Sequence, residues 1–504
     1  MHNQVVTLVR GRWVLSHPEQ GDAGLREHAA VAIDDTGQIV AVDPFNDLRA
    51  QYPHARVEGS ANDLILPGFV DAHSHGMGLS YFELGLGYDH LESWNLSLPT
   101  VQRPDPYLDS LWCAIKHLRS GCTTIHHMGG AAEAPIQAYR ELGIRWAFSL
   151  TVKNKHLITY DDDAFADHLP PALRERARPW LSPDSERLRA EYLEHFESIH
   201  SGFHAPEHPV LFGPMGPQWC SEGLLRCIAR RARDENIRIH MHGIQTPYQR
   251  DALPRRRGMT GVEYLESLDL LGEHLTLGHG VWVNESDIER LAASGTSLTH
   301  HASCNLQMRN GILPLTALQD QGIPVAIGID GKGINDDEDM MQEMRLIEKL
   351  HRIADLRFGA PLTVTPERIL SMATVNGAAT LGMEGIIGRL APGYAADLLV
   401  VDLTPRPWMH PENSPLDQVV MERRREDIRT VMVQGQVVVR NGQIPGLDEE
   451  ALLSALIDSI SGPSDRSSDA RLFQELKPYV QDFYRRWDEE ETTNSPGFYQ
   501  VNRR

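Results

Sequence analysis

Eight short apolar segments alternate with helical segments along most of this 504-residue chain, and this alternation restricts the fold more than any other feature. The apolar segments have the length and composition of buried strands. They lie at residues 65–70, 122–127, 145–151, 209–213, 237–242, 274–279, 296–300 and 323–328. Apolar residues with helical spacing separate them, for example over 221–234, 262–271 and 285–294. Eight strands alternating with helices predict an α/β fold, a (β/α)₈ TIM-like barrel.

Both ends of the chain carry strand patterns of a different kind. Residues 4–16 and 29–42 are predicted strands with a turn at 34–37, and the pattern returns at 395–402 and 430–439. We therefore expect a small β-sandwich domain built from both chain ends, 1–65 and 388–446, around a barrel spanning 66–387. Residues 447–504 are predicted as a C-terminal helical extension, with helices over 447–460 and 471–487, a polar linker at 461–469 and a polar tail. This extension either covers a barrel face or a neighbouring subunit, or is a solvated tail with one docked helix.

Two histidines stand at the end of the first predicted barrel strand, in the run Leu66-Pro-Gly-Phe-Val-Asp-Ala-His-Ser-His-Gly76. Because side chains alternate along a strand, His73 and His75 share one face and can point at one metal ion. Alone, such a pair is as well explained by ordinary surface or core histidines. Three further candidates follow at later strand ends: His242 in the fifth, where it shares a face with His240, His279 in the sixth, and Asp330 in the eighth.

The C-terminal strand ends of such a barrel form its mouth, where catalytic groups collect. Histidine nitrogens with one carboxylate are a ligand set for Zn²⁺ or Fe²⁺. We therefore expect one divalent metal ion, Zn²⁺ or alternatively Fe²⁺. His126, His127, His300 and His301 lie near other strand ends, and their positions alone place them as further candidates for the pocket.

The composition restricts the partners. A formal net charge of −21 argues against nucleic acid and anionic membranes, both of which require a positive face. The five cysteines are scattered, so a disulfide framework is not expected. Neither a signal peptide nor a membrane-spanning stretch is recognisable. The expected partner is a small-molecule substrate, and the expected location is the cytoplasm.

The chain resembles the amidohydrolase superfamily, within it the atrazine chlorohydrolase and cytosine/S-adenosylhomocysteine deaminase-like group. The resemblance covers roughly residues 5 to 445. Its motifs are Pro67-Gly-Phe-Val-Asp-Ala-His-Ser-His75, Gly121-Cys-Thr-Thr-Ile125, His240-Met-His242, Gly278-His-Gly280, Ile327-Gly-Ile-Asp-Gly331, Met372-Ala-Thr-Val-Asn-Gly-Ala-Ala-Thr-Leu-Gly382 and Gly388-Arg-Leu-Ala-Pro-Gly-Tyr-Ala-Ala-Asp-Leu398.

The resemblance implies a mononuclear site with His73, His75, His242 and Asp330 as metal ligands. It implies catalytic roles for Asp330, which handles the proton of the attacking water, and for His279, as a further ligand or as the electrophile that stabilises developing charge. No lysine is well placed to be the carboxylated lysine of binuclear relatives; Lys153 follows the third strand, one strand early. The resemblance also suggests a homodimer or larger homo-oligomer.

Two departures from the family pattern bear on the substrate. Family deaminases place Glu three residues after the fifth-strand ligand, and this chain has Gln245, which cannot shuttle a proton but can orient a substrate. In the loop after strand seven, His300 and Asn305 match the family's His-Asn-Pro-x-Ser-Asn pattern, whereas His301, Ala302 and Cys304 do not. The predicted substrate-binding residues are Trp219, Gln218, His301, Asn305, Met77 and Tyr81; for the pocket-wall candidates among them ordinary packing is an equal alternative.

The expected activity is metal-dependent hydrolysis of a C–N bond, of the deaminase or aminohydrolase type, on an amine-substituted heterocycle. An amidase or cyclic amidase acting on a carbonyl C–N bond is the alternative, slightly favoured by Gln245. The third possibility is a non-catalytic barrel retained for binding, although such a protein should have lost metal ligands.

Overall fold

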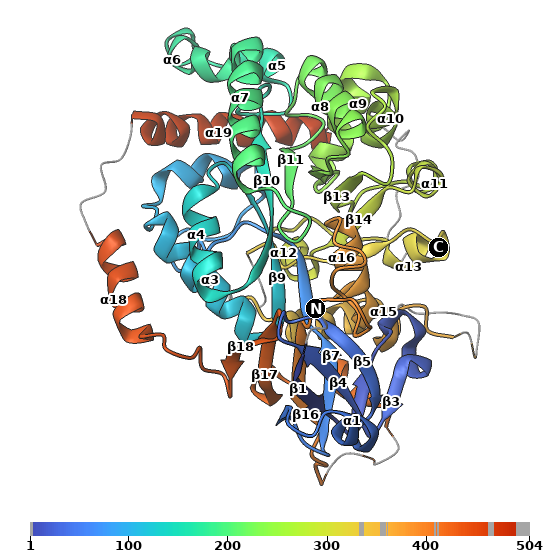
Figure 1. Cartoon of the computed structure of the whole chain (residues 1–504). Helices are drawn as coiled ribbons and strands as arrows, with labels where there is room; N and C mark the ends of the chain where they lie inside the picture. Colours follow the sequence, from blue (N-terminus) through green and yellow to red (C-terminus); the bar gives the residue numbers. More distant parts are fainter. Residues whose placement is uncertain are drawn as a thin grey trace.

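Eight parallel strands form a nearly closed barrel in the centre of the molecule, as the computed structural model shows (Figure 1). The structure describes residues 4–331, 337–352, 359, 361–407, 410, 413–461 and 468–489. In chain order the barrel strands are β8 (Phe69–Ser74), β9 (Cys122–Gly129), β10 (Arg145–Val152), β11 (Val210–Pro214), β12 (Ile239–Gly243), β13 (Leu275–His279), β14 (Ser297–His300) and β15 (Val325–Ile327). The predicted α/β barrel is confirmed.

The first predicted strand, 65–70, is wrong as a single element. The structure divides it at Gly68 into β7 (Asp63–Pro67), which belongs to another sheet, and β8, which opens the barrel. A Cβ atom at Gly68 would lie 2.1 Å from the Thr123 hydroxyl, so only glycine allows the chain to pass between the two sheets here. His73 consequently lies inside β8 instead of following a strand end.

The barrel closes between its first strand and the segment after its last. The backbone N–H of Asp330 donates to the carbonyl of His73 at 2.8 Å. The N–H of Gly328 donates to the carbonyl of His300 at 3.0 Å and continues the pairing of β14 with β15. The first of these bonds fixes Asp330 beside β8 through the backbone, independently of its side chain.

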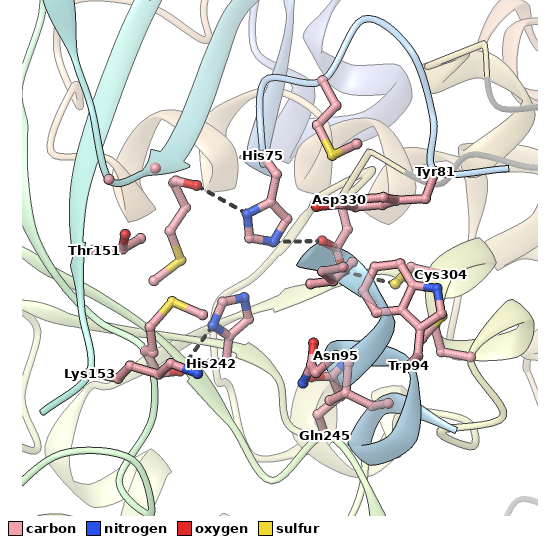
Figure 2. Close-up of a pocket in the computed structure, with 18 of the residues that line it drawn as sticks. His75, Tyr81, Trp94, Asn95, Thr151, Lys153, His242, Gln245, Cys304 and Asp330 are labelled. Carbon is pink, nitrogen blue, oxygen red and sulfur yellow. Dashed lines mark hydrogen bonds and ion pairs between the residues drawn. The ribbon is translucent and has the colours of Figure 1, made fainter. Parts of the chain in front are cut away.

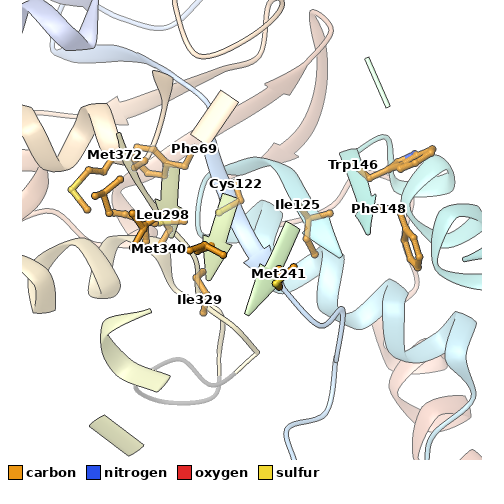
Figure 3. Packing of buried hydrophobic residues seen from close by; sticks show 14 of the residues in the cluster. Phe69, Cys122, Ile125, Trp146, Phe148, Met241, Leu298, Ile329, Met340 and Met372 are labelled. Carbon is orange, nitrogen blue, oxygen red and sulfur yellow. The ribbon is translucent and has the colours of Figure 1, made fainter. Parts of the chain in front are cut away.

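Helices surround the barrel and bury the apolar faces of its strands. The longer ones are α3 (Pro106–Arg119), α4 (Glu133–Leu142), α6 (Pro171–Leu181), α7 (Ser185–Phe203), α8 (Glu222–Asp234), α9 (Pro247–Arg257), α11 (Glu285–Ser294) and α14 (Met340–Leu350). Local signals set their ends: Ser221 caps α8, and Asn284 with Asp287 forms a capping box at α11. Phe69, Ile125, Met241 and Leu298 pack in the core between strands and helices (Figure 3).

The shorter helices complete the connections. They are α1 (Phe45–Gln51), α2 (Leu91–Trp94), α5 (Asp162–Ala166), α10 (Gly261–Ser267), α12 (Ala302–Gln307), α13 (Leu315–Asp320), α15 (Pro366–Met372), α16 (Val375–Thr380) and α17 (Pro415–Met421), with the 3₁₀ segments η1 (Pro18–Gly24), η2 (Asn95–Thr100) and η3 (Arg425–Asp427). Among the described residues, no helix is both long enough and apolar enough to cross a membrane.

Two further sheets are built from the chain ends and lie together at the bottom of Figure 1. One has the order β5-β4-β1-β6: β5 (Ile39–Pro44), β4 (Ala29–Asp34), β1 (Val5–Arg10) and β6 (Arg56–Glu58). The other has the order β18-β17-β16-β7-β2-β3: β18 (Gln436–Arg440), β17 (Ile428–Val433), β16 (Leu398–Asp402), β7, β2 (Trp13–Leu15) and β3 (Leu25–Glu27). Val9, Val31, Ile65 and Val400 belong to one apolar cluster that joins the two sheets. The domain boundaries given above stay a prediction.

A buried ion pair joins the barrel to the six-stranded sheet that contains β16 and β7. Arg145 of β10 donates to both carboxylate oxygens of Asp397, at 2.8 and 3.1 Å, and both side chains are almost fully buried. We expect Asp397→Asn to lower the free energy of unfolding by about 3–5 kcal/mol, because the guanidinium would stay buried without its counter-charge. The shift of the denaturant midpoint measures this effect. The exposed pair Arg187–Glu191 provides the control, since Glu191→Gln should shift the midpoint far less.

The C-terminal extension contains two helices, α18 (Glu449–Ile460) and α19 (Ser468–Glu489). In Figure 1, α19 runs across the end of the molecule opposite the two end sheets, beside α5, α6 and α7. Its buried residues Leu476, Val480 and Phe483 pack in a cluster with Tyr81 and Trp94, which follow the first barrel strand. The extension therefore covers the barrel face that carries the C-terminal strand ends. The predicted linker lies mostly, and the polar tail wholly, outside the described residues.

Candidate metal centre and active site

One carboxylate lies at the centre of a group of histidines at the barrel mouth. Asp330 Oδ1 is 3.1 Å from His75 Nε2 and 3.6 Å from His73 Nε2. Its Oδ2 is 3.4 Å from His301 Nδ1 and 3.7 Å from His279 Nε2. Figure 2 shows the contact between His75 and Asp330 at the cavity wall, with His242 nearby.

Every residue predicted from the sequence as a metal ligand reaches this group. His73, His279, His301 and Asp330 each offer one ligand atom, and these atoms lie within 4.8 Å of one another. The same holds for His73, His75 and His242, so His73 belongs to both sets. His301, which the sequence placed among the substrate contacts, instead presents a nitrogen to Asp330. The only sequence signal for a role of His301 at the site was its position next to a predicted strand end.

The hydrogen bonds of the histidines show why a cation fits here. Nδ1 of His75 lies 3.0 Å from the carbonyl of Met128, and Nδ1 of His242 lies 3.0 Å from that of Met215. A carbonyl only accepts, so each Nδ1 carries the proton and each Nε2 of the neutral ring presents a lone pair. The lone pair of His75 then faces a carboxylate oxygen. A cation between the two groups would attract both. Hydrogen bonds from Nδ1 to a backbone carbonyl commonly orient metal-binding histidines.

Buried nitrogens without partners support the same conclusion. Among the described residues, His73 Nε2, His279 Nε2 and His301 Nδ1 are buried and make no hydrogen bond, yet all three point at Asp330. Buried polar atoms without partners are uncommon in folded proteins and often mark a site for an ion. The donor set, imidazole nitrogens with a carboxylate, fits a divalent metal ion.

The protonation states also suit a cation. Burial lowers the pKa of His73 and His279 well below the ordinary value and that of His242 to about 3, so these imidazoles are neutral. Burial alone would raise the pKa of Asp330, but contacts with His301 and His73 hold it well below its usual range. Neutral imidazoles around an ionised carboxylate are the forms that bind a metal ion.

The backbone at the two later strand ends is strained. His279 has φ = 73° and Asp330 has φ = 66°, both in the left-handed region that non-glycine residues rarely adopt. Such conformations persist only where the surrounding structure holds them, and they are concentrated at functional sites. Here they turn both side chains back toward the centre of the barrel mouth.

A second layer of side chains holds the first. His240 Nε2 lies 2.7 Å from His73 Nδ1 beneath the site, and Asp71 accepts from the backbone N–H of both His73 and Ile329. Cys304 Sγ lies 2.9 Å from Asp330 Oδ2. The sequence contained no signal for the contacts of Asp71 and Cys304, because they depend on how β8 meets the segments after β14 and β15.

Asn305 orients His279. Its Oδ1 lies 2.9 Å from His279 Nδ1 and also accepts from Asn310, so His279 Nδ1 carries the proton and Nε2 keeps the lone pair. We expect Asn305→Ala to lower metal affinity or kcat by about 10- to 100-fold, which is typical for the loss of such a partner. Metal titration and steady-state kinetics measure the two effects. Equal values for the variant and the wild type in both measurements would contradict this role.

A cavity of about 480 Å³ opens beside the histidine group. Met77, Tyr81, Trp219 and Gln245 line it, as the sequence predicted, together with His75, His242, His279 and Asp330. Trp94, Asn95, Lys153 and Cys304 are further wall residues that the prediction missed (Figure 2). The size is within the roughly 300–1,000 Å³ typical of small-molecule sites.

Three residues predicted to contact substrate are placed elsewhere. Gln218, His301 and Asn305 are buried and are not among the described residues that line the cavity. His301 and Asn305 instead contact Asp330 and His279 from behind. Of the other histidines near strand ends, His127 lines the cavity, whereas His126 bonds to Ser149 and His300 to His351 inside the protein.

Comparison with characterised proteins gives a consistent picture. A 5'-deoxyadenosine deaminase from Methanopyrus kandleri is 29% identical over 440 residues, which cover 85% of this chain and 93% of the relative. A 5-methylthioadenosine/S-adenosylhomocysteine deaminase from Pyrococcus furiosus is 30% identical over 417 residues, covering 81% of this chain and 91% of the relative. The predicted class of hydrolase, acting on non-peptide C–N bonds, is thereby confirmed.

The fold is also shared with solved structures. A zinc-bound adenosine deaminase from Xanthomonas campestris has a TM-score of 0.74 at 23% identity, covering 94% of this chain and 99% of that one. A zinc complex of an atrazine chlorohydrolase from Arthrobacter aurescens has a TM-score of 0.74 at 22% identity, covering 90% of this chain and all (100%) of the other. The amidohydrolase family itself matches residues 64–438. This chain belongs to the amidohydrolase family.

Proposed function

We propose that this protein removes an exocyclic amine from an amine-substituted heterocycle, with adenosine-type nucleosides as the first substrates to test. The observation that carries the proposal is the ring of imidazole lone pairs around Asp330, at the wall of a cavity large enough for such a ligand. The deaminases from Methanopyrus kandleri and Pyrococcus furiosus align over more than four-fifths of the chain and supply the choice of substrate class.

His73, His75, His242 and Asp330 would hold the metal ion, with His279 and His301 next to it. A bound divalent ion supplies Lewis-acid chemistry, which makes a water molecule a stronger nucleophile near neutral pH. We propose Zn²⁺, because the two solved structures named above contain zinc, and keep Fe²⁺ as the alternative.

Removal of the metal tests this assignment. We expect a chelator to abolish activity and Zn²⁺ to restore it, with about one equivalent of metal per chain by elemental analysis. If Fe²⁺ under anaerobic conditions restored activity and Zn²⁺ did not, Fe²⁺ would replace Zn²⁺ as the proposed metal. Full activity in metal-free protein would reject it.

Asp330 is the group that moves protons. Its carboxylate is ionised, and it is positioned to take a proton from the attacking water and return it to the leaving amine. Water adds to the ring carbon, the C–N bond breaks, and the amine leaves with the returned proton. His279 keeps a lone pair on Nε2, since its Nδ1–H is directed to Asn305, and this geometry supports an accepting or ligating role more than that of an electrophile.

Gln245 lines the cavity without a titratable proton, so it orients the substrate by hydrogen bonds. The substrate ring should therefore be activated enough to react without a second proton shuttle. A carbonyl C–N substrate satisfies the same requirement, so an amidase or cyclic amidase is the second candidate.

A mass-spectrometric product screen of the metal-replete enzyme tests both candidates together. The panel contains adenosine, 5'-deoxyadenosine, 5'-methylthioadenosine, aminopyrimidines, pterins, aminotriazines, cyclic imides, lactams and N-acyl amides. Exchange of an amine for oxygen would establish the deaminase, whereas ring opening or acyl cleavage would establish the amidase. Inactivity on the whole panel, with metal bound, would favour the non-catalytic alternative.

We also propose that the protein forms a homodimer or larger homo-oligomer and is located in the cytoplasm. Light scattering of the purified protein tests the first, and fractionation of the producing cells tests the second.

A further inference from the structure

A second cavity adjoins the active-site cavity. It has a volume of about 250 Å³ and shares the wall residues Asn95, Leu98, Lys153 and Trp219 with the first. The two spaces therefore share this part of their walls. The metal-binding group lies on the wall of the first cavity only, so the second has no part in the chemistry proposed above.

Aromatic side chains form much of the wall of the second cavity. They come from four parts of the chain: Tyr160 from the loop after β10, Trp180 from α6, Trp219 from the loop after β11, and Phe473 and Tyr484 from α19. Leu96, Leu98 and Ile158 add aliphatic surface. A concave space with such walls is suited to apolar groups, and aromatic rings give the largest gain on burial.

The helix α19 lies outside the part of the chain that the amidohydrolase family model covers. The amidohydrolase family match ends at residue 438, and α19 begins at Ser468. Two residues in the wall of the second cavity, Phe473 and Tyr484, thus come from an element outside the family match. The extension helix therefore closes part of this cavity, and loops that follow the barrel strands form the rest of its wall.

α19 is held firmly against the barrel mouth. The backbone N–H of Tyr160 donates to the Tyr484 hydroxyl at 3.0 Å, and Lys477 donates to Ser97 at 3.1 Å. Tyr160 in turn donates to the buried carboxylate of Glu92 at 2.8 Å, which also accepts from Thr246, the residue after Gln245. This network connects α19 to the active-site wall, so the second cavity is a preformed part of the site.

Lys153 lines both cavities, and its ammonium has donor capacity that the protein does not use. Its side chain is exposed although it is surrounded by protein, because it projects into the cavity space. Its ammonium makes one long hydrogen bond, to the carbonyl of Leu157 at 3.4 Å, and among the described residues no carboxylate lies within ion-pair distance. An ammonium in this position can donate to an oxygen of a ligand that spans both cavities.

We propose that the second cavity is a substrate subsite that takes an apolar substituent of the amino-heterocycle, and that Lys153 donates to an oxygen atom linking the two parts. This inference rests on the proposed function and narrows its substrate class. The reacting ring occupies the first cavity, and an alkylthio or arylthio group packs between Trp180, Trp219 and Phe473. The extension helix then determines which substituents are accepted.

A series of ligands with one changing group tests the subsite. The probes are 5'-deoxyadenosine and its 5'-methylthio, 5'-propylthio and 5'-benzylthio derivatives, measured with zinc-loaded full-length protein by calorimetry and by steady-state kinetics. We expect affinity to rise on the order of tenfold or more from the methylthio to the benzylthio compound, as apolar surface is buried. A flat series, or no binding by any member, overturns the proposal.

Phe473→Trp is the decisive variant because it fills the second cavity from α19. It should weaken binding of the benzylthio compound most and that of 5'-deoxyadenosine, which has no substituent at this position, least. Gln474→Trp, the same substitution at the exposed neighbouring position, is the matched control and should behave as the wild type. Leu157→Trp narrows the cavity from the opposite loop, so it gives the same test if the helix variant does not fold. Equal losses for all four ligands in both filling variants would overturn the subsite.

Lys153→Met tests the junction separately. It retains the aliphatic chain and removes the ammonium, so it should weaken all four ligands by a similar factor without changing the dependence on substituent length. Unchanged affinity would remove Lys153 from the proposal. Binding and turnover also separate this inference from the proposed function. Binding that depends on substituent length, without turnover, would reject the deaminase activity and support the subsite. Turnover that does not depend on substituent length would support the deaminase activity and reject the subsite.

Discussion

Asp330→Asn is expected to reduce kcat by at least about 10³-fold, on the order of the contribution of a general acid–base group together with the loss of a ligand charge. The amide retains the shape of the side chain but cannot take a proton, and it no longer supplies a negative charge among the imidazoles. Steady-state kinetics on the best substrate of the product screen measures the first effect. Elemental analysis of the dialysed protein measures the second, which should appear as reduced metal content.

The backbone hydrogen bond of Asp330 should keep the fold intact in this variant. Its N–H donates to the carbonyl of His73, so the barrel seam stays closed when the carboxylate is lost. Asp320→Asn at an exposed position is the matched control and should leave activity and metal content unchanged. An Asp330→Asn protein with normal kcat would show that another group handles the proton.

Gln245→Glu is expected to change the pH dependence of the reaction and to widen the substrate range, with metal content unchanged. Gln245 is buried at the cavity wall, so a carboxyl group placed there should have a pKa above the ordinary value for glutamate. The carboxylate is the form that accepts a proton from water. Activity that depends on it should therefore decline as the pH falls through this raised pKa, giving an acidic limb that the wild type lacks.

For less activated amino-heterocycles, the added proton shuttle should raise kcat by about 10²-fold or more. A comparison of pH–rate profiles for the wild type, Gln245→Glu and the non-titrating Gln245→Met measures the effect. The methionine variant separates the gain of a titratable group from the loss of the amide. Identical profiles and substrate ranges for all three proteins would remove this position from the reaction.

The sequence was sufficient to predict the barrel because its signal is local. Seven of the strands follow the predicted segments to within about two residues, and the helix predicted over 285–294 is α11 itself. The arrangement of His73, His75, His242, His279 and Asp330 followed from one further rule, that parallel strands bring their C-terminal ends to one rim. The four histidines lie within or directly after their strands, and Asp330 lies three residues after β15.

Features that depend on distant segments could not be predicted. The division of the first strand depends on Thr123, which fills the space beside Gly68. The approach of His301 to Asp330 depends on how the loop after β14 is oriented, and its neighbours depart from the family pattern. The helical period of α19 was visible, but the partner of its apolar face was not, because Tyr81 and Trp94 lie almost 400 residues earlier.

The six-stranded sheet has a consequence for the synthesis of this protein. Because β7 pairs with β16, the sheet cannot be completed until Leu398, the partner of Pro67, has been synthesised. At about 5–20 residues per second, the ribosome needs between roughly 15 seconds and a minute to produce the intervening chain. Throughout this time, the edge of Asp63–Pro67 that pairs with β16 has no partner, whereas its other edge can already pair with β2. Newly made chains should therefore depend on chaperones that shield this segment, and slower growth at low temperature should increase the yield of folded protein.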